Sequence, residues 1–231
     1  MTEWLGPQEW AAVGLSLKVA FWAMLGAVLP GVFVAYALAR WDFFGKQFVN
    51  VLVHLPLVLP PVATGYLLLV TFGTQGFIGS ALKEIGVVFA FRWTGAALAA
   101  AVMAFPLLVR SIRLSIEATD PKLEQAAATL GASRLWVFAT VTLPLMLPGL
   151  LAGMVLAFAK AMGEFGATIT FVSNIPGQTR TLPSAIYAFL QVPGGETAAM
   201  RLVVVSIIVA AGALILSEVL ARRIAKKVGQ V

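Results

Sequence analysis

The sequence contains no cysteine and a single histidine, His54, among its 231 residues. Disulfide bonds and thiolate metal sites are therefore excluded, and one imidazole cannot by itself form a metal cluster. Charge is also scarce, because only 11% of the residues are charged, against about 25% in a typical soluble domain. Hydrophobic residues make up 60% of the chain. Most of the protein must therefore lie in lipid.

A phosphate-binding loop of the form G-x-x-x-x-G-K-[ST] is missing as well, so the chain lacks the usual means of binding ATP. No Ser/His/Asp set and no cluster of histidine with carboxylates indicates chemistry on a substrate. We therefore expect no enzyme activity, no metal and no bound cofactor. The net charge of +6 could indicate a nucleic-acid partner, but excess Lys and Arg is typical of the cytoplasmic loops of membrane proteins. We prefer the second interpretation and expect no nucleic acid.

Five apolar stretches reach the roughly 20 residues that a membrane-spanning helix needs. They are approximately 12–39, 48–72, 93–112, 145–170 and 200–221. A sixth apolar segment, 183–192, is too short and is predicted to lie at the outer face or to dip back in, with a sixth full span as the alternative. The predicted fold is an all-α polytopic membrane protein with five transmembrane helices in 12–221, after an external segment, 1–11, and before a basic tail, 222–231.

Lys and Arg are unevenly distributed between these spans. If the first and third connections face the cytoplasm, that side holds ten of the 16 basic residues, including those of the tail. The opposite side holds four, and Lys18 and Lys160 lie within spans. The positive-inside rule then places the N-terminus outside, the C-terminus in the cytoplasm and residues 117–142, between the third and fourth spans, in the cytoplasm.

The cytoplasmic region 117–142 is predicted to form a pair of short helices. Asp120 can cap the first helix, and Gly131 can adopt the left-handed conformation that ends it. Ser133 can cap the second helix. The apolar positions of the first helix recur at i, i+3, i+4 and i+7 and are Leu123, Ala126, Ala127 and Leu130.

The spans themselves contain features that plain anchors do not need. Prolines interrupt four of them, at Pro30, Pro56, Pro60, Pro61, Pro106, Pro144 and Pro148. A proline frees a backbone carbonyl that needs protein or water as a partner in lipid, so broken helices tend to face a bundle interior or a pathway. The alternative is that these prolines only shape helix packing.

Charge within the fourth span is the second such feature, because Lys160 and Glu164 are spaced i, i+4 and share a helix face. Such a pair either neutralises itself and holds the bundle together, or faces a water-filled route. Small polar residues follow it at Thr168, Thr170, Ser173 and Asn174. These suit a hydrated anion, and they equally suit packing between membrane helices. Elsewhere, we expect Lys18 to snorkel to the outer surface and His54 to be a hydrogen-bonded core residue.

The cytoplasmic stretch resembles the signature of permeases in binding-protein-dependent ABC importers. That signature runs Glu-Ala-Ala, three residues, Gly, nine residues, a β-branched residue, any residue and Leu-Pro. The matching positions here are Gln125, Ala126, Ala127, Gly131, Val141, Leu143 and Pro144. Gln125 departs from the signature, because it stands in place of the glutamate, with Glu124 immediately before it. The resemblance implies an ATPase-coupling site formed by Glu124, Gln125, Ala126, Ala127, Gly131, Ala132, Leu143 and Pro144.

The resemblance extends over 12–221 and is greatest to molybdate permeases, in 54–61, 163–168 and 174–181, with sulfate and tungstate permeases similar in these regions. It implies an ABC importer transmembrane domain of the bacterial-type inner membrane, which forms the pathway for ATP-driven import of molybdate, or else of tungstate or sulfate. The implied partners are a second copy of the permease, two cytoplasmic ATPase subunits that use the ATP, and an external oxyanion-binding protein.

Two other hypotheses remain open from the residues alone. The chain could be a self-sufficient secondary transporter that uses Lys160 and Glu164 as a proton or anion relay, although five spans without an evident inverted repeat argue against this. It could also be a membrane scaffold that only recruits a partner.

Overall fold

The computed structural model describes residues 4–228, except for the side chains of 217, 220–222 and 224–228. Within this part of the chain every regular element is a helix. Four helical segments are long and apolar enough to cross a membrane, namely Pro7–Arg40, Trp93–Glu117, Arg134–Met162 and Glu196–Leu216. A fifth span exists if the bent pair Lys46–Val58 and Pro61–Phe72 counts as one. The expected polytopic all-α fold is confirmed.

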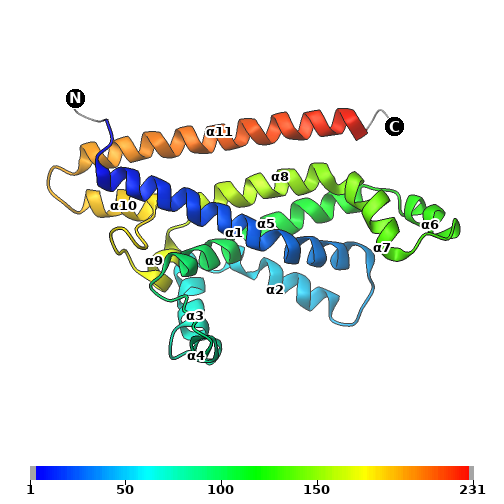
Figure 1. The fold of residues 1–231 in the computed structure, drawn as a ribbon, viewed down its shortest axis with the longest axis horizontal. Coiled ribbons are helices and arrows are strands. Elements are labelled where there is room, and N and C mark those ends of the chain that lie inside the picture. Colours follow the sequence, from blue (N-terminus) through cyan, green and yellow to red (C-terminus); the bar gives the residue numbers. More distant parts are fainter. Residues whose placement is uncertain (1–3, 229–231) are drawn as a thin grey trace.

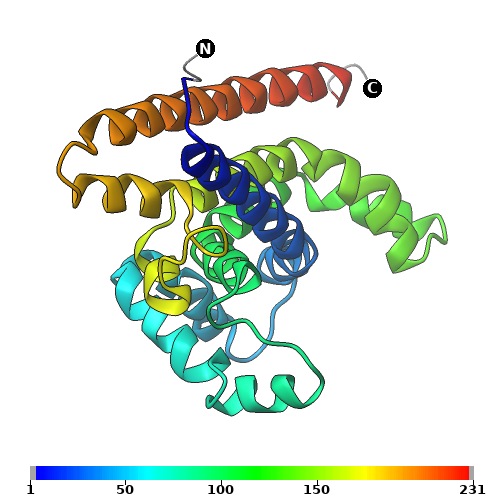
Figure 2. The same cartoon turned by 60° about the vertical axis from the view of Figure 1, so that its left-hand side comes forward.

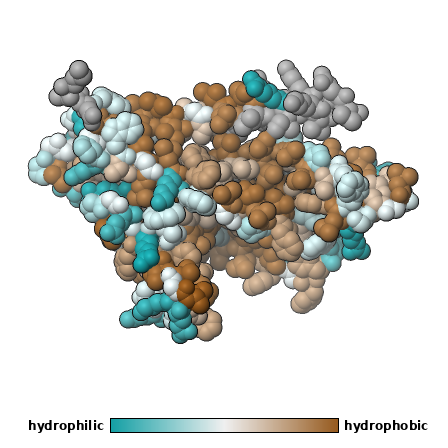
Figure 3. All heavy atoms as spheres, in the orientation of Figure 1, coloured by the Kyte–Doolittle hydropathy of each residue, from teal (hydrophilic) through white to brown (hydrophobic). Residues whose placement is uncertain are grey.

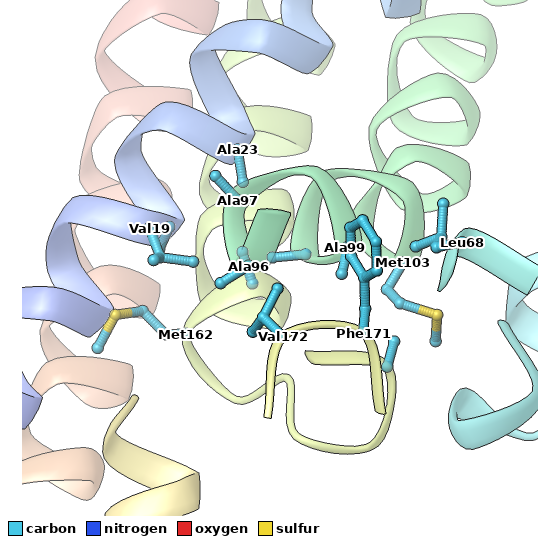
Figure 4. Packing of buried hydrophobic residues seen from close by; sticks show 14 of the residues in the cluster. Val19, Ala23, Leu68, Ala96, Ala97, Ala99, Met103, Met162, Phe171 and Val172 are labelled. Atoms are coloured by element: carbon cyan, nitrogen blue, oxygen red, sulfur yellow. The ribbon is translucent and has the colours of Figure 1, made fainter. Parts of the chain in front are cut away.

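The centre of the molecule is a bundle of three long helices, α1 (Pro7–Arg40), α5 (Trp93–Glu117) and α8 (Leu143–Met162). Small residues allow α5 and α8 to approach closely. A Cβ atom at Gly149 would lie 2.3 Å from the Cβ of Ser115, and one at Gly153 would lie 3.1 Å from Leu108. Alanines of α5 likewise allow α1 to approach closely, and Figure 4 shows Ala96, Ala97 and Ala99 facing the surrounding helices.

The predicted second span is broken. It consists of α2 (Lys46–Val58) and α3 (Pro61–Phe72), which are bent by 116° relative to one another. The break falls at Leu59 and Pro60, where proline cannot donate the backbone hydrogen bond that a continuous helix requires. A short helix that sequence reasoning did not predict, α4 (Phe77–Glu84), follows α3.

The predicted fourth span, 145–170, is wrong at both ends. Helical structure begins earlier, with α7 (Arg134–Val137) and a five-residue π-helix, η1 (Phe138–Thr142), that continues into α8. Helix α8 ends at Met162, and a separate helix, α9 (Gly166–Val172), follows. Gly163 ends α8. The prediction continued the span to residue 170 because the residues of α9 are also apolar. They are buried within the protein, where Phe171 and Val172 pack among the alanines of α5 (Figure 4).

The half-helices α3 and α9 pack directly on one another. A Cβ atom at Gly65 would lie 2.5 Å from the carbonyl oxygen of Ala167, and one at Gly166 would lie 2.8 Å from Pro61. Glycine is therefore required on both sides of this contact. The broken spans thus meet each other within the protein, as expected for interrupted helices in lipid.

The last helix, α11 (Glu196–Val228), runs along the outside of the bundle against α8 and α10 (Leu182–Leu190) (Figures 1 and 2). Helix α10 has only nine residues, which agrees with the prediction that this segment is too short to span the membrane. Figure 1 shows α10 at the end of the bundle that holds the N-terminus, while α6 (Pro121–Thr129), α7 and the C-terminal end of α11 share the opposite end. Figure 3 shows the face of the molecule that is turned to the viewer in Figure 1. Hydrophobic side chains cover the middle of that face, and hydrophilic ones gather toward its ends.

Candidate coupling and intramembrane sites

The helix pair α6 and α7 forms as its local sequence predicts. The side chain of Asp120 accepts a hydrogen bond from the backbone N–H of Lys122 at 2.9 Å, and Ser133 accepts one from the N–H of Trp136 at 3.3 Å. Gly131 has a φ of +86°, so it ends α6 in the left-handed conformation that glycine adopts at little cost. The predicted caps and the glycine turn are confirmed.

This helix pair exposes a set of large apolar side chains at the tip of the molecule. Leu130 is 89% exposed, Leu135 is 82% exposed and Trp136 is 64% exposed, while Leu123 is half exposed. We call these four residues the coupling surface. Gln125 and Ala126 are also exposed, whereas Ala127, Ala132, Leu143 and Pro144 are half-buried. An apolar surface on an otherwise polar element is typical of a protein–protein contact.

Glu124 and Gln125 face different surroundings although they are adjacent. An oxygen of the Glu124 carboxylate accepts a hydrogen bond from Arg40 Nε at 3.2 Å and another from the Thr142 hydroxyl at 3.0 Å. Arg40 also donates from Nη2 to the carbonyl oxygen of Thr119 at 3.0 Å. Glu124 therefore ties α6 to the end of α1 and to η1, and we call Arg40, Glu124 and Thr142 the clamp. Gln125 points to the surface.

Sequence reasoning missed two members of the clamp. Arg40 ends α1 and is one of the ten basic residues assigned to the cytoplasmic side, and 84 positions separate it from Glu124. Thr142 lies on η1, and no pattern in the sequence marks a π-helix there. Of the three clamp residues, the sequence pointed only to Glu124, because it is a carboxylate within the region of the family signature.

The predicted intramembrane pair is present, and it spans the break between α8 and α9. Lys160 Nζ lies 2.7 Å from Glu164 Oε2, and the other oxygen of Glu164 accepts the backbone N–H of Ala167 at 3.0 Å. The side chain of Glu164 is 2% exposed and that of Lys160 is 31% exposed. Both carboxylate oxygens thus have partners, and together they fix the first turn of α9 relative to the last turn of α8.

The small polar residues after Glu164 use their groups within the protein. The hydroxyl of Thr168 donates to the carbonyl oxygen of Phe165 at 2.9 Å, and that of Thr170 donates to Gly166 at 2.8 Å. The amide oxygen of Asn174 accepts from Arg180 Nε at 3.0 Å. Ser173 has a φ of +65° and contributes its carbonyl oxygen to the Thr179 hydroxyl. The hydroxyl protons of Thr168 and Thr170 are therefore engaged by their own helix in this conformation.

Three further polar residues of the spans have notable surroundings. His54 Nδ1 lies 2.8 Å from the carbonyl oxygen of Asn50, one turn earlier on α2, and its side chain is half-buried rather than part of a core. Lys18 Nζ lies 3.8 Å from the centre of the Trp93 ring. The hydroxyl of Thr64, on α3, is buried without a hydrogen-bond partner in the part of the chain that the structure describes.

Comparison with solved structures defines the class of fold. The structure is similar to that of a bacterial ABC transporter involved in the import of the acidic polysaccharide alginate, with a TM-score of 0.74, 18% identity, and coverage of 94% of this chain and 80% of that one. It is also similar to an amino acid ABC transporter, with a TM-score of 0.67, 19% identity and 94% of both chains covered. The fold is thus that of ABC transporter membrane subunits.

Sequence comparison narrows this class to a family. The family described as "Binding-protein-dependent transport system inner membrane component" matches residues 19–229, and the chain belongs to it. It is 58% identical to the molybdenum transport system permease protein ModB of Escherichia coli K12 over 223 residues, which cover 96% of this chain and 97% of that one. It is 56% identical to the ModB of Haemophilus influenzae, with the same coverage. The sulfate transport system permease protein CysT of Salmonella typhimurium is 36% identical, covering 80% of this chain and 67% of CysT.

The chain is therefore a multi-pass component of an inner-membrane transport system and not an enzyme, as the missing catalytic and phosphate-binding motifs predicted. Among the side chains that the structure describes, no group of acidic, histidine or cysteine residues could hold a metal ion.

Proposed function

We propose that this chain forms the transmembrane pathway for ATP-driven import of molybdate. The observation that carries the proposal is the near full-length likeness to proteins named as molybdenum transport permeases, at 56–58% identity, against 36% for a sulfate permease. Tungstate and sulfate are the alternative substrates, and the transport experiment described below distinguishes them from molybdate. The proposed partners are a second copy of the permease, two cytoplasmic ATPase subunits and an external oxyanion-binding protein. The ATP is used by the ATPase subunits alone.

The coupling surface is the proposed contact with the ATPase. It consists of apolar side chains on two short capped helices, which a cleft in a partner can grip as a rigid knob. Burial of such side chains contributes about 1.5–3 kcal/mol each, so burying Leu130, Leu135 and Trp136 in the cleft would stabilise the docked complex. Closure of the two ATPase subunits would then move the knob and, with it, the spans.

The clamp is the proposed route by which that movement reaches the bundle. Glu124 connects α6 to α1 through Arg40 and to the start of α8 through Thr142 and η1. A displacement of α6 must therefore either move these two helices or break hydrogen bonds to a charged group, each worth about 1.5–3 kcal/mol. The carboxylate of Glu124 acts within this chain, whereas the exposed Gln125 is the residue available to the ATPase.

The proposed orientation has the N-terminus outside and the C-terminus in the cytoplasm. It is supported by the excess of basic residues in the connections on one side. It also fits the arrangement in Figure 1, where the coupling helices and the C-terminal end of α11 share one end of the bundle.

The alternative of a self-sufficient secondary transporter would use Lys160 and Glu164 as a relay. The geometry favours a structural role for this pair, because both oxygens of Glu164 have partners and its side chain is buried. A relay through the carboxylate would need Glu164 to face water, and only Lys160 of the pair is partly exposed. We therefore place the pair at the edge of the pathway, as a support for α9.

The decisive experiment is reconstitution in liposomes with the ATPase and with the binding protein loaded with molybdate, tungstate or sulfate. We expect ATP-dependent uptake of molybdate, no uptake when the ATPase is omitted, and none with an ion gradient alone. Transport of molybdate by the purified chain without ATPase would instead establish the secondary transporter.

A variant tests the coupling site in the same assay. Gly131→Trp introduces a side chain at a φ of +86° and so distorts the turn between α6 and α7. Insertion in the membrane should be unchanged and ATP-driven uptake should be abolished. Normal uptake by this variant would refute the proposed coupling site.

A further inference from the structure

A cavity of about 530 Å³ opens at the end of the bundle opposite the coupling surface. It lies where the first half of α1, the chain before α5, and the loop between α9 and α10 come together. Its polar lining consists of Lys18, Arg92, Thr94 and Gln178, with the backbone of Gly86 and Gly177. We call it the basic cavity.

The two cations of the basic cavity are not neutralised. Neither Lys18 nor Arg92 forms an ion pair with any residue that the structure describes, and no acidic side chain is among the described residues lining the cavity. Other cations on the described chain do find carboxylates, such as Arg201, which makes two hydrogen bonds to Glu9. Lys18 and Arg92 are both exposed, and the described lining of the cavity offers neither of them a carboxylate.

The position of the Lys18 ammonium group is set by a contact that does not cancel its charge. The ammonium group of Lys18 rests over the Trp93 ring at 3.8 Å, and a cation–π contact orients a cation while leaving its charge intact. Arg92 immediately precedes Trp93, so the second cation stands on the adjacent residue. Lys18 is exposed, in agreement with the prediction that it extends to the surface, and its ammonium group also lies against an aromatic ring.

Two further features suit an anion. Helix α5 begins at Trp93, and no side chain caps its N-terminus, so the positive end of a 25-residue helix opens beside the two cations. The hydroxyl of Thr94 and the amide of Gln178 can add neutral hydrogen-bond donors. At both Gly86 and Gly177 the space beyond the Cα atom is open, which leaves room for a partly hydrated ligand.

We propose that the basic cavity binds a tetrahedral oxyanion, with Lys18 and Arg92 as its charged ligands. Two sources share this chemistry, the transported oxyanion and the phosphate of an anionic lipid headgroup. If the occupant is molybdate, the inference rests on the proposed function, and the cavity is a station at the outer mouth of the pathway. A doubly charged anion would neutralise both cations at once.

The test is equilibrium dialysis of labelled molybdate against the permease–ATPase complex, purified in a maltoside detergent that contains no phosphate. Lys18→Gln and Arg92→Gln should each weaken binding about tenfold, because each removes a charge-assisted hydrogen bond. Lys18→Arg should retain most of the binding. The matched control is Lys83→Gln, which removes an exposed cation outside the cavity and should leave binding unchanged.

A parallel arm measures by native mass spectrometry how much phosphatidylglycerol remains bound to each variant. Weaker molybdate binding in the two cavity variants alone supports the transported anion as occupant. A loss of retained lipid in these variants, with molybdate binding unchanged, supports the headgroup phosphate. The site is overturned if neither measurement changes, or if Lys83→Gln has the same effect. Failure of the proposed function would show differently, as wild-type complex that hydrolyses ATP without taking up molybdate.

Discussion

The coupling region and the α8–α9 junction each contain a carboxylate that pairs with a cation, yet the two regions differ in what they expose around it. At the junction Glu164 is buried and satisfied by a lysine and a backbone N–H. In the coupling region Glu124 is turned inward while Leu130, Leu135 and Trp136 are exposed. The first arrangement stabilises a single chain, whereas the second leaves binding energy available for another subunit.

The largest effect should follow from breaking the buried pair at the junction. Glu164→Ala leaves the Ala167 N–H and the Lys160 ammonium without their acceptor and should destabilise the protein by about 3 kcal/mol. We expect a lower yield of assembled complex and a lower melting temperature in detergent. The double variant Lys160→Met/Glu164→Leu, which removes both charges, should restore assembly. If it assembles but uptake stays altered, Glu164 lines the route instead.

The next largest effect should come from placing charge on the coupling surface. Trp136→Asp puts a carboxylate into the proposed docking contact and should weaken ATPase binding by about 100-fold, because a charge would be buried there unpaired. The permease alone should keep its melting temperature, since the side chain is exposed. Co-purification of the ATPase with the permease measures this effect. Undiminished co-purification would show that the ATPase docks elsewhere.

Opening the clamp should have an intermediate effect, on coupling rather than on assembly. Glu124→Ala removes the acceptor of Arg40 and Thr142, so α6 can move without the bundle. ATPase activity should continue, with several-fold less molybdate imported per ATP hydrolysed. Gln125→Ala is the matched control on the same helix and should leave this ratio unchanged. Equal ratios in the two variants would contradict the role of the clamp.

The smallest effect should come from restoring the glutamate of the family signature. Gln125→Glu adds a carboxylate at an exposed position, where solvent screens it, so the stability of the permease should not change measurably. Uptake should stay within about twofold of wild type. A large gain in uptake would mean that the ATPase reads a negative charge at this position, and that the coupling contact is not mainly apolar.

The local features of the coupling region could be predicted because they depend on neighbouring residues. Asp120, Gly131 and Ser133 each act on backbone within three positions, and all three were predicted in the roles that they take. The Lys160–Glu164 pair could be predicted for the same reason, from a spacing of four residues. The clamp could not be predicted, because Arg40 and Glu124 come together only through the packing of α1 and α5 and the path of the chain into α6.

The sequence by itself determined that this is a polytopic helical membrane protein, because hydropathy and helix caps are properties of composition and of short segments. The prolines of the second span marked its break in the sequence, but only the tertiary structure decided where the fourth span ends. The apolar residues of α9 extend the apolar run of that span, and they form a separate helix that packs against α3 and α5. It also decided which charges are paired. Arg40 and Glu124, like Arg201 and Glu9, are far apart in the sequence, and only the fold brings their side chains within 4 Å of one another.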